Sequence, residues 1–201
     1  MYLTLLCYTT VCMTSNNVLS ADNQQERLRL PNPWYISGFV DGEGSFHIAI
    51  YKDLKMKINL KIIPEFHISQ NASSRIVLEQ IQEMLKCGNI KENHRGRESD
   101  KTCVLVVRNR EDLLKKVIPF FERYQLRTTK AQDFQTFAKV VNMMSNGLHQ
   151  TVLGAKKIIS LAYNMNAGGI RRKTKQVDLI KIVESSETIR ETSRNKVERK
   201  I

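Results

Sequence analysis

The chain has 201 residues, and its 32 Lys and Arg against 20 Asp and Glu give a formal net charge of +12. This length predicts one domain or at most two small ones. The excess of positive charge favours a polyanionic partner, most commonly nucleic acid, with an acidic membrane surface or no such partner as the alternatives. The four cysteines and four histidines are scattered, which gives no disulfide framework and little support for a zinc site, so we expect reduced cysteines in an intracellular protein.

The first 31 residues are predicted to form a flexible leader. The run Tyr2–Met13 is mostly apolar, but it is interrupted by threonines and is too short to span a bilayer. No basic residue precedes it, as a secretory signal would require, and the leader is less Arg-rich than an organellar transit peptide. The polar stretch Thr14–Arg27 is typical of a disordered arm.

A short helix is predicted to follow, with Asn32 as its N-cap, Pro33 as its first residue, and Gly42 and Gly44 at its end. The last turn of a helix carries free carbonyls that favour cations nearby, yet Glu43 stands there. A carboxylate beside free carbonyl oxygens suits a hard divalent cation. We therefore predict a magnesium site at this helix end.

The same helix has two glycines on one face. Gly38 and Gly42 are four residues apart with Ser37 beside them, and the missing side chains let another backbone come close. We predict that the helix packs against a second copy of itself through Ser37, Gly38, Asp41 and Gly42. Asp41 is expected to have a structural role, bonding interface or backbone groups.

Alternation of apolar and polar residues predicts strands at 45–51, 57–64 and 65–70, and a fourth at 102–107 after the polar stretch 91–101. Together they predict an antiparallel sheet with one basic, polar face. Such a face fits the major groove of duplex DNA, and a merely solvated face is the alternative.

Helical periodicity predicts the remaining elements, whose apolar stripes are expected to be core. They are a helix capped by Asn71 or Ser73 and stopped at Gly88, one from Asn109 to before Pro119, and helices over 130–144, 148–163 and 177–183.

The stretch from Ile36 to Gly44 resembles the motif that names the LAGLIDADG homing endonucleases, and Ser45 and Phe46 continue it. It departs from that name at Ile36, Ser37 and Glu43, where Glu43 keeps a carboxylate but adds a methylene. The resemblance covers about residues 32–174.

The resemblance implies an α+β protein with the αββαββα fold and additional C-terminal helices. It implies an endonuclease domain at 32–175, between the leader at 1–31 and a C-terminal helix and charged tail at 176–201. It also implies site-specific cleavage of double-stranded DNA that promotes intron mobility. The single motif implies a homodimer that binds a long pseudo-palindromic target, with two or three Mg²⁺ ions per dimer held by Glu43 and the carbonyl of Gly42.

Three further positions gain catalytic roles from the resemblance. Gln70 falls where related enzymes place a residue that orients water, with a surface or helix-capping role as the alternative. Lys130 or Arg127 could supply the basic residue near the scissile phosphate, and we favour Lys130. Arg75 is a weaker candidate for the same cluster.

The residues expected to contact DNA lie on the outward sheet face, in the neighbouring loop and strand, and in a basic C-terminal loop that resembles the phosphate-gripping loop of the family. They are Ser45, His47, Tyr51, Lys57, Asn59, Lys61, His67, Lys91, Asn93, Arg95, Arg97, Arg171, Arg172 and Lys173.

Two other functions share this fold or surface. One is an intron maturase that binds intron RNA and assists splicing, although the retained Glu43 favours a nuclease. The other is a DNA-binding regulator that does not cut. A membrane-surface protein ranks last, because no strong basic amphipathic helix is present. The resemblance places the protein in a chloroplast or mitochondrion, with a bacterial cytoplasm as the alternative.

Overall fold

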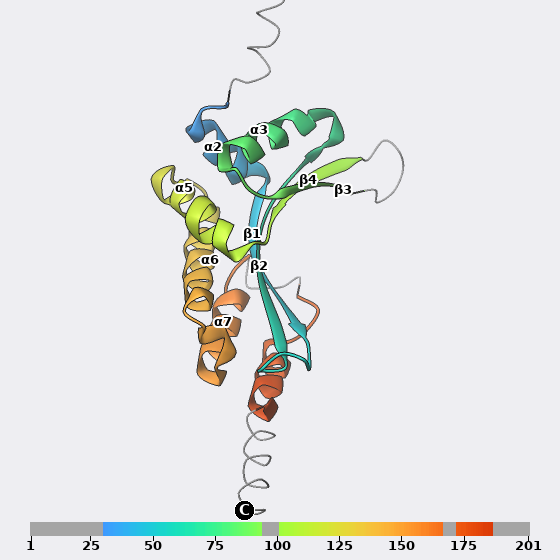
Figure 1. Ribbon diagram of the computed structural model, residues 1–201, viewed down its shortest axis with the longest axis vertical. Helices are drawn as coiled ribbons and strands as arrows, with labels where there is room; N and C mark the ends of the chain where they lie inside the picture. The colour runs from blue at the N-terminus through green and yellow to red at the C-terminus, as the bar shows by residue number, and fades with distance from the viewer. Residues whose placement is uncertain (1–29, 94–100, 167–171, 187–201) are drawn as a thin grey trace, which may run out of the picture. The chain divides into compact units, whose positions relative to one another are not determined.

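A four-stranded antiparallel sheet in the order β1-β2-β4-β3 forms the centre of the fold (Figure 1). The computed structural model describes residues 30–93, 101–166 and 172–186. The strands are β1 (Gly44–Lys52), β2 (Leu60–Asn71), β3 (Asn89–Asn93) and β4 (Thr102–Val107). The α+β class and the four-stranded antiparallel sheet are therefore confirmed. The predicted leader at 1–31 and the tail beyond 186 lie almost wholly outside the described residues.

The strand boundaries differ from the prediction. The two strands expected at 57–64 and 65–70 are the single strand β2, and residues 57–59 belong to the turn before it. Pro64 does not break β2, because no N–H is needed there to pair with β1. Its partner Ile48 points its carbonyl away from β2, where the carbonyl accepts a hydrogen bond from Arg172. The nitrogen of Pro64 then faces the β4 side, where pairing begins only at Phe66.

Strand β3 was not predicted as a strand. Its sequence Asn-Ile-Lys-Glu-Asn contains one apolar residue, Ile90, so alternation alone could not separate it from a polar loop. Pairing with β4 places Ile90 opposite the buried Leu105 and thereby extends the sheet.

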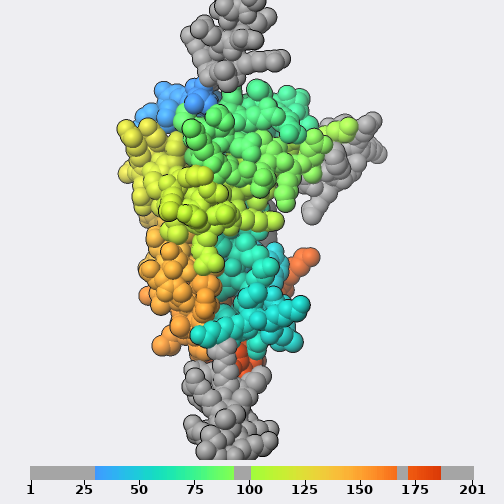
Figure 2. Space-filling view, in the orientation of Figure 1, coloured from blue at the N-terminus to red at the C-terminus, as the bar shows by residue number. Residues whose placement is uncertain are grey.

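The core lies on one side of the sheet. Phe46 of β1 stacks on Phe66 of β2, with ring centroids 4.9 Å apart, and also contacts Phe121, Phe134 and Phe137 from the helices. In Figure 1 the helices α6 (Lys130–Ser145) and α7 (Val152–Tyr163) run beside β1 and β2. The space-filling view shows the hairpin end of β1 and β2 in turquoise next to these orange helices (Figure 2). This core leaves the opposite sheet face for other contacts.

The remaining helical elements follow the predicted order. They are α2 (Pro33–Glu43), η1 (Ala72–Ser74), α3 (Arg75–Leu85), α4 (Arg110–Asp112), η3 (Leu113–Val117), α5 (Ile118–Arg123), η4 (Leu148–Gln150) and a helix over residues 176–186. Helix α3 ends at Leu85, and its C-cap is Lys86 with a positive φ of 50°, rather than Gly88.

The helix expected to stop before Pro119 continues through it. Asn109 caps the stretch as expected, accepting from the amides of Glu111 and Asp112. The π-helical turn η3 then changes the hydrogen-bond spacing immediately before Pro119, which has no N–H to give, so the chain stays helical to Arg123.

Within the described ranges, no helix is both long and apolar enough to cross a membrane.

Candidate functional site

The change from helix α2 to strand β1 is made at Gly44. The side chain of Asn32 caps the start of α2 by accepting from the amide of Trp34 at 2.9 Å. At the other end the amide of Gly44 donates to the carbonyl of Val40. A Cβ at Gly44 would lie 2.5 Å from Val40 Cγ1 and 2.8 Å from Val40 O, so only glycine fits. This tight junction places Glu43, the last residue of α2, on the exposed surface.

Lys130 occupies the C-terminal end of α2. Its Nζ donates to the carbonyls of Asp41 at 2.7 Å and Gly42 at 2.8 Å, and more distantly to Val40 at 3.3 Å. A cation there satisfies free carbonyls and complements the helix dipole. The favoured basic residue thus lies at the predicted metal site, whereas Arg127 contributes its backbone amide, which donates to Asp41.

Lys130→Met should lower the free energy of unfolding by about 1–2 kcal/mol, because the half-buried carbonyls at the end of α2 lose their charged donor. Urea unfolding would measure the change. Lys139→Met is the matched control, since Lys139 is an exposed residue of the same helix. Equal stability of the two variants would show that the contacts of Lys130 do not hold α2.

Asp41 is committed to its own chain. Its carboxylate accepts from the amides of Arg127 at 2.8 Å and Thr128 at 3.2 Å, and from the hydroxyl of Thr128 at 2.7 Å. Burial raises the pKa of Asp41, but the hydrogen bonds from Thr128 and Arg127 together outweigh it and lower the pKa below its usual value. Asp41 therefore ties α2 to the segment before α6.

The lowered pKa of Asp41 gives a pH-dependent contribution to stability. Because the folded pKa lies below the unfolded value of about 3.9, the ionised carboxylate stabilises the fold above that pH and the contribution is lost as pH falls through the folded pKa. Asp41→Asn should therefore be less stable than the native chain at pH 7, with the difference shrinking between about pH 5 and pH 3. Urea unfolding across this range measures it, and a difference independent of pH would refute the assignment.

The donor atoms at the end of α2 suit a hard divalent cation. Glu43 offers an exposed carboxylate and Gly42 a carbonyl, so the set is all oxygen. The Gly42 oxygen already accepts from Lys130, but a carbonyl has a second lone pair. Gln70 lies in β2 two residues beyond Ile68, the partner of Gly44, so it is at the same end of the sheet. Its Oε1 accepts from the amide of Asn71 at 2.7 Å.

One face of α2 is open. A Cβ built at Gly38 or Gly42 meets no atom within 4 Å, and Trp34 and Tyr35 beside them are about half exposed, at 50% and 49%. A side chain at either glycine would therefore meet nothing within the described part of the chain.

Ser37 departs from the predicted interface. It is 3% exposed, and its hydroxyl donates to the carbonyl of Tyr124 at 2.6 Å. The side chain faces the core side of α2, so its assignment to a surface that meets a second copy is wrong.

Six of the fourteen predicted DNA-contact residues share the outer face of the sheet. Ser45 and His47 of β1 alternate with the buried Phe46 and Ile48. His67 of β2 pairs with Ser45, so its side chain lies on the same face. The other members with this orientation are Tyr51, Lys61 and Lys91. Asn93 pairs with Thr102 at the end of β3.

Several predicted contacts have other positions. Lys57 and Asn59 lie in the turn between β1 and β2, where Asn59 has a positive φ of 57°, rather than on a strand. Lys173 is exposed. Arg95, Arg97 and Arg171 lie outside the described residues.

Arg172 makes contacts inside its own chain that its predicted role in phosphate binding did not include. Its guanidinium donates to the carbonyls of Ile48 and Ala162, both at 2.9 Å, and lies over the ring of Tyr163 at 4.9 Å. Asn166 similarly donates to the carbonyl of Phe46 at 3.0 Å. These side chains satisfy the free edge of β1, so Arg172 fixes the segment after α7 to the sheet.

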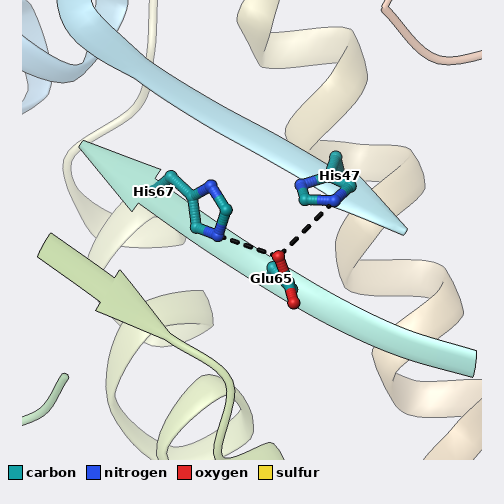
Figure 3. Close-up of side chains that lie close together, drawn as sticks. All are labelled: His47, Glu65 and His67. Atoms are coloured by element: carbon teal, nitrogen blue, oxygen red, sulfur yellow. Dashed lines mark ion pairs between the residues drawn. The ribbon is translucent and has the colours of Figure 1, made fainter. Parts of the chain in front are cut away.

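The outer face also holds a buried carboxylate that was not predicted as a site (Figure 3). Glu65 is 4% exposed, with Oε2 lying 2.9 Å from Nε2 of His67 and 3.5 Å from Nε2 of His47. Its Oε1 lies 2.6 Å from Nε of Arg108. Burial lowers the pKa of both histidines, although Glu65 opposes this.

His47 and His67 are twenty residues apart in the sequence, and this separation hides their proximity in the folded sheet. The useful signal was the pattern Glu65-Phe66-His67, which puts both polar residues on one face of β2, together with His47 on the same face of β1.

A family model described as LAGLIDADG endonuclease matches residues 36–141. The chain is 34% identical over 137 residues to "Probable intron-encoded endonuclease 3" of Neurospora crassa, covering 68% of this chain and 25% of that protein. It is 33% identical over 119 residues to "DNA endonuclease I-CeuI" of Chlamydomonas moewusii, covering 58% and 53%. The chain thus spans from a quarter to about half the length of these curated relatives.

Solved structures with the same fold match more of their own length. The homing endonuclease I-TnaI has a TM-score of 0.66 and 34% identity, and the match covers 78% of this chain and 98% of that one. An archaeal intron-encoded homing endonuclease complexed with DNA has a TM-score of 0.69 and 31% identity, with coverage of 78% and 96%.

Proposed function

Because the chain belongs to the LAGLIDADG endonuclease family, we propose that it is a site-specific DNA endonuclease that makes a double-strand cut as a homodimer and promotes intron mobility. The observation that carries the proposal is the C-terminal end of α2. There an exposed Glu43 carboxylate, the Gly42 carbonyl and the Lys130 ammonium lie together beside an open helix face.

A second copy completes the site. One Glu43 cannot hold the metal cluster that a two-metal hydrolysis needs, whereas two copies of α2 packed at Gly38 and Gly42 bring two Glu43 carboxylates to one axis. A twofold dimer binds a target of matching symmetry, so we propose a long and nearly palindromic site.

Glu43 and the Gly42 carbonyl would hold Mg²⁺, which when bound supplies an activated water and neutralises charge on the phosphate. Lys130 would hold positive charge near the scissile phosphate, positioned by its bonds to the carbonyls of α2. Gln70, at the same end of the sheet, would orient water by hydrogen bonding.

The outer sheet face would read the DNA. A curved antiparallel sheet enters the major groove, and Ser45, Lys61 and Lys91 project from three different strands of that face. Contacts to phosphate should make binding fall with salt, by about one unit of log–log slope per contact.

The test is cleavage of a DNA library that includes candidate intron-insertion sites, with Mg²⁺ and with a chelator in its place. The expected result is a double-strand cut at one long site that requires the metal. Tight binding to a DNA site without a cut in any divalent metal would identify a regulator, and binding of folded intron RNA alone would identify a maturase; either outcome overturns the proposal. The relatives named as intron-encoded support an intron origin, and from it we propose a chloroplast or mitochondrial location.

A further inference from the structure

From the cluster on the outer sheet face we infer that His47, Glu65 and His67 form a second metal site, which binds one Zn²⁺ or a similar transition-metal dication per chain. It is separate from the oxygen-only site at the end of α2, and it does not rest on the proposed nuclease activity. Figure 3 shows both imidazoles, from β1 and β2, turned toward the Glu65 carboxylate.

The distances fit three donors around one ion. One ligand atom from each residue lies within 4.8 Å of the others. Zinc bonds to nitrogen and oxygen at about 2.1 Å, so donors at 90–109° to one another should lie about 3.0–3.4 Å apart. The two Nε2-to-Oε2 separations, 2.9 and 3.5 Å, fall 0.1 Å outside the two ends of this range, and the separation between the imidazole nitrogens is at most 4.8 Å. Rotation of the imidazoles toward a shared ion would bring all three separations into the range.

The donors are also available. His67 Nε2 is buried, and the partner it has in the described part of the chain is Glu65 Oε2, an ion-pair contact at 2.9 Å. Neutral imidazole nitrogens are metal donors, and an ion between Nε2 and Oε2 would take the place of this direct contact. The imidazoles keep 33% and 25% of their side-chain surface exposed, so an ion can reach them from outside.

Arg108 sets the orientation of the carboxylate. It contacts Oε1 and leaves Oε2 toward the imidazoles, as outer partners of ligating carboxylates commonly do. The positive charge of Arg108 disfavours a nearby dication. The two imidazole nitrogens, and a water or anion at the open coordination position, would offset this repulsion.

The donor types decide the metal. Two imidazoles and one carboxylate suit Zn²⁺, Co²⁺ or Ni²⁺, whereas Mg²⁺ prefers oxygen ligands and retained water. The open position would face the same side as the predicted DNA surface, so the bound ion would add positive charge there.

The test uses the full chain after removal of metals with a chelator. Isothermal titration with Zn²⁺ should give one site, and Co²⁺ should give a visible spectrum of nitrogen and oxygen ligands without a thiolate charge-transfer band, which excludes the cysteines. Loss of a residue that only hydrogen-bonds a metal ligand weakens metal binding by about 10–100-fold. The variants His47→Gln and His67→Gln each remove a ligand itself, so each should weaken Zn²⁺ binding by at least that much. His149→Gln, a histidine of η4 outside the cluster, should bind as the native chain does.

A second measurement needs no variant. Zn²⁺ should shift the imidazole NMR signals of His47 and His67 and leave that of His149 unchanged, which guards against variants that fail to fold. The inference is overturned if Zn²⁺ does not bind, if both glutamine variants bind as tightly as the native chain, or if the cobalt spectrum shows thiolate ligands. Loss of DNA cleavage would not bear on these readouts, so the two proposals can fail independently.

Discussion

Glu43→Gln is expected to lower the rate of DNA cleavage by more than about a hundredfold. Removing a residue that only hydrogen-bonds a metal ligand costs up to about a hundredfold, and Glu43 is proposed to be a ligand itself. The substitution keeps the size of the side chain and removes its charge. In a twofold dimer it removes both central carboxylates at once. Steady-state and single-turnover cleavage of the target would measure the loss.

Binding of the target DNA should survive this change. Glu43 is exposed at the end of α2, so its replacement removes no core contact, and the loss of negative charge does not weaken attraction to phosphate. A filter-binding or anisotropy titration should therefore give an affinity close to that of the native chain. Failure of both binding and cleavage would point to a folding defect rather than to catalysis.

Two controls sharpen the result. Glu83→Gln changes an exposed glutamate of α3 and should cut normally. Glu43→Asp restores the carboxylate on a side chain one methylene shorter, and should recover part of the activity. If Glu43→Gln cuts at the native rate, Glu43 has no part in the reaction.

The local chemistry of the sequence was enough to predict α2 and the strand after it. Asn32 and Pro33 determine where the helix starts and Gly44 where it stops, whereas Gly42 lies within its last turn. These signals act over a few residues. Similarly, strict alternation in β1 predicts which side chains face the core. The fold class followed from these elements and from the resemblance carried by the motif.

The positions of the Ser37 and Arg172 side chains and the existence of β3 could not be predicted, because they depend on contacts between residues far apart in the sequence. Ser37 is turned inward by its hydrogen bond to the carbonyl of Tyr124, and Arg172 is hydrogen-bonded to carbonyls of β1 and α7. Neither contact could be predicted from the residue type. Strand β3 exists because β4 pairs with it, not because of its own pattern. Tertiary context overrides local preference in each case.

The capping role of Lys130 shows the same limit at the site itself. Family resemblance pointed to a basic residue near the phosphate, but no local pattern indicated that its ammonium would donate to the carbonyls of Asp41 and Gly42. This contact couples the charge of Lys130 to the orientation of α2, so catalytic and structural effects of its variants must be separated by unfolding measurements.

Gly38→Leu is expected to dissolve the dimer while leaving the monomer folded. Overpacking costs about 1–3 kcal/mol per site, and symmetry places the new side chain in the interface twice. The dimer dissociation constant should therefore rise by at least about thirtyfold. Sedimentation velocity over a range of concentrations would measure it, and cleavage should fall in parallel because each chain carries only half of the carboxylates.

The monomer should tolerate the change because a Cβ at Gly38 meets no atom of its own chain within 4 Å. Leucine is also the better helix former, so the free energy of unfolding of the isolated chain should stay the same or rise by about 0.5–1 kcal/mol. This opposite sign separates the prediction from ordinary destabilisation. Gly44→Leu, by contrast, would collide with Val40 and should unfold the α2–β1 junction.

Glu83→Leu controls for a new exposed leucine, since it lies on the surface of α3 and should sediment like the native chain. Gly38→Ala adds a single methyl group and should give an intermediate effect, because the close approach of two helix backbones is graded by side-chain size. A Gly38→Leu chain that sediments as the native dimer would mean that the open face of α2 is not the contact between copies. The two Glu43 carboxylates would then lie apart, and a shared metal cluster between them would be ruled out.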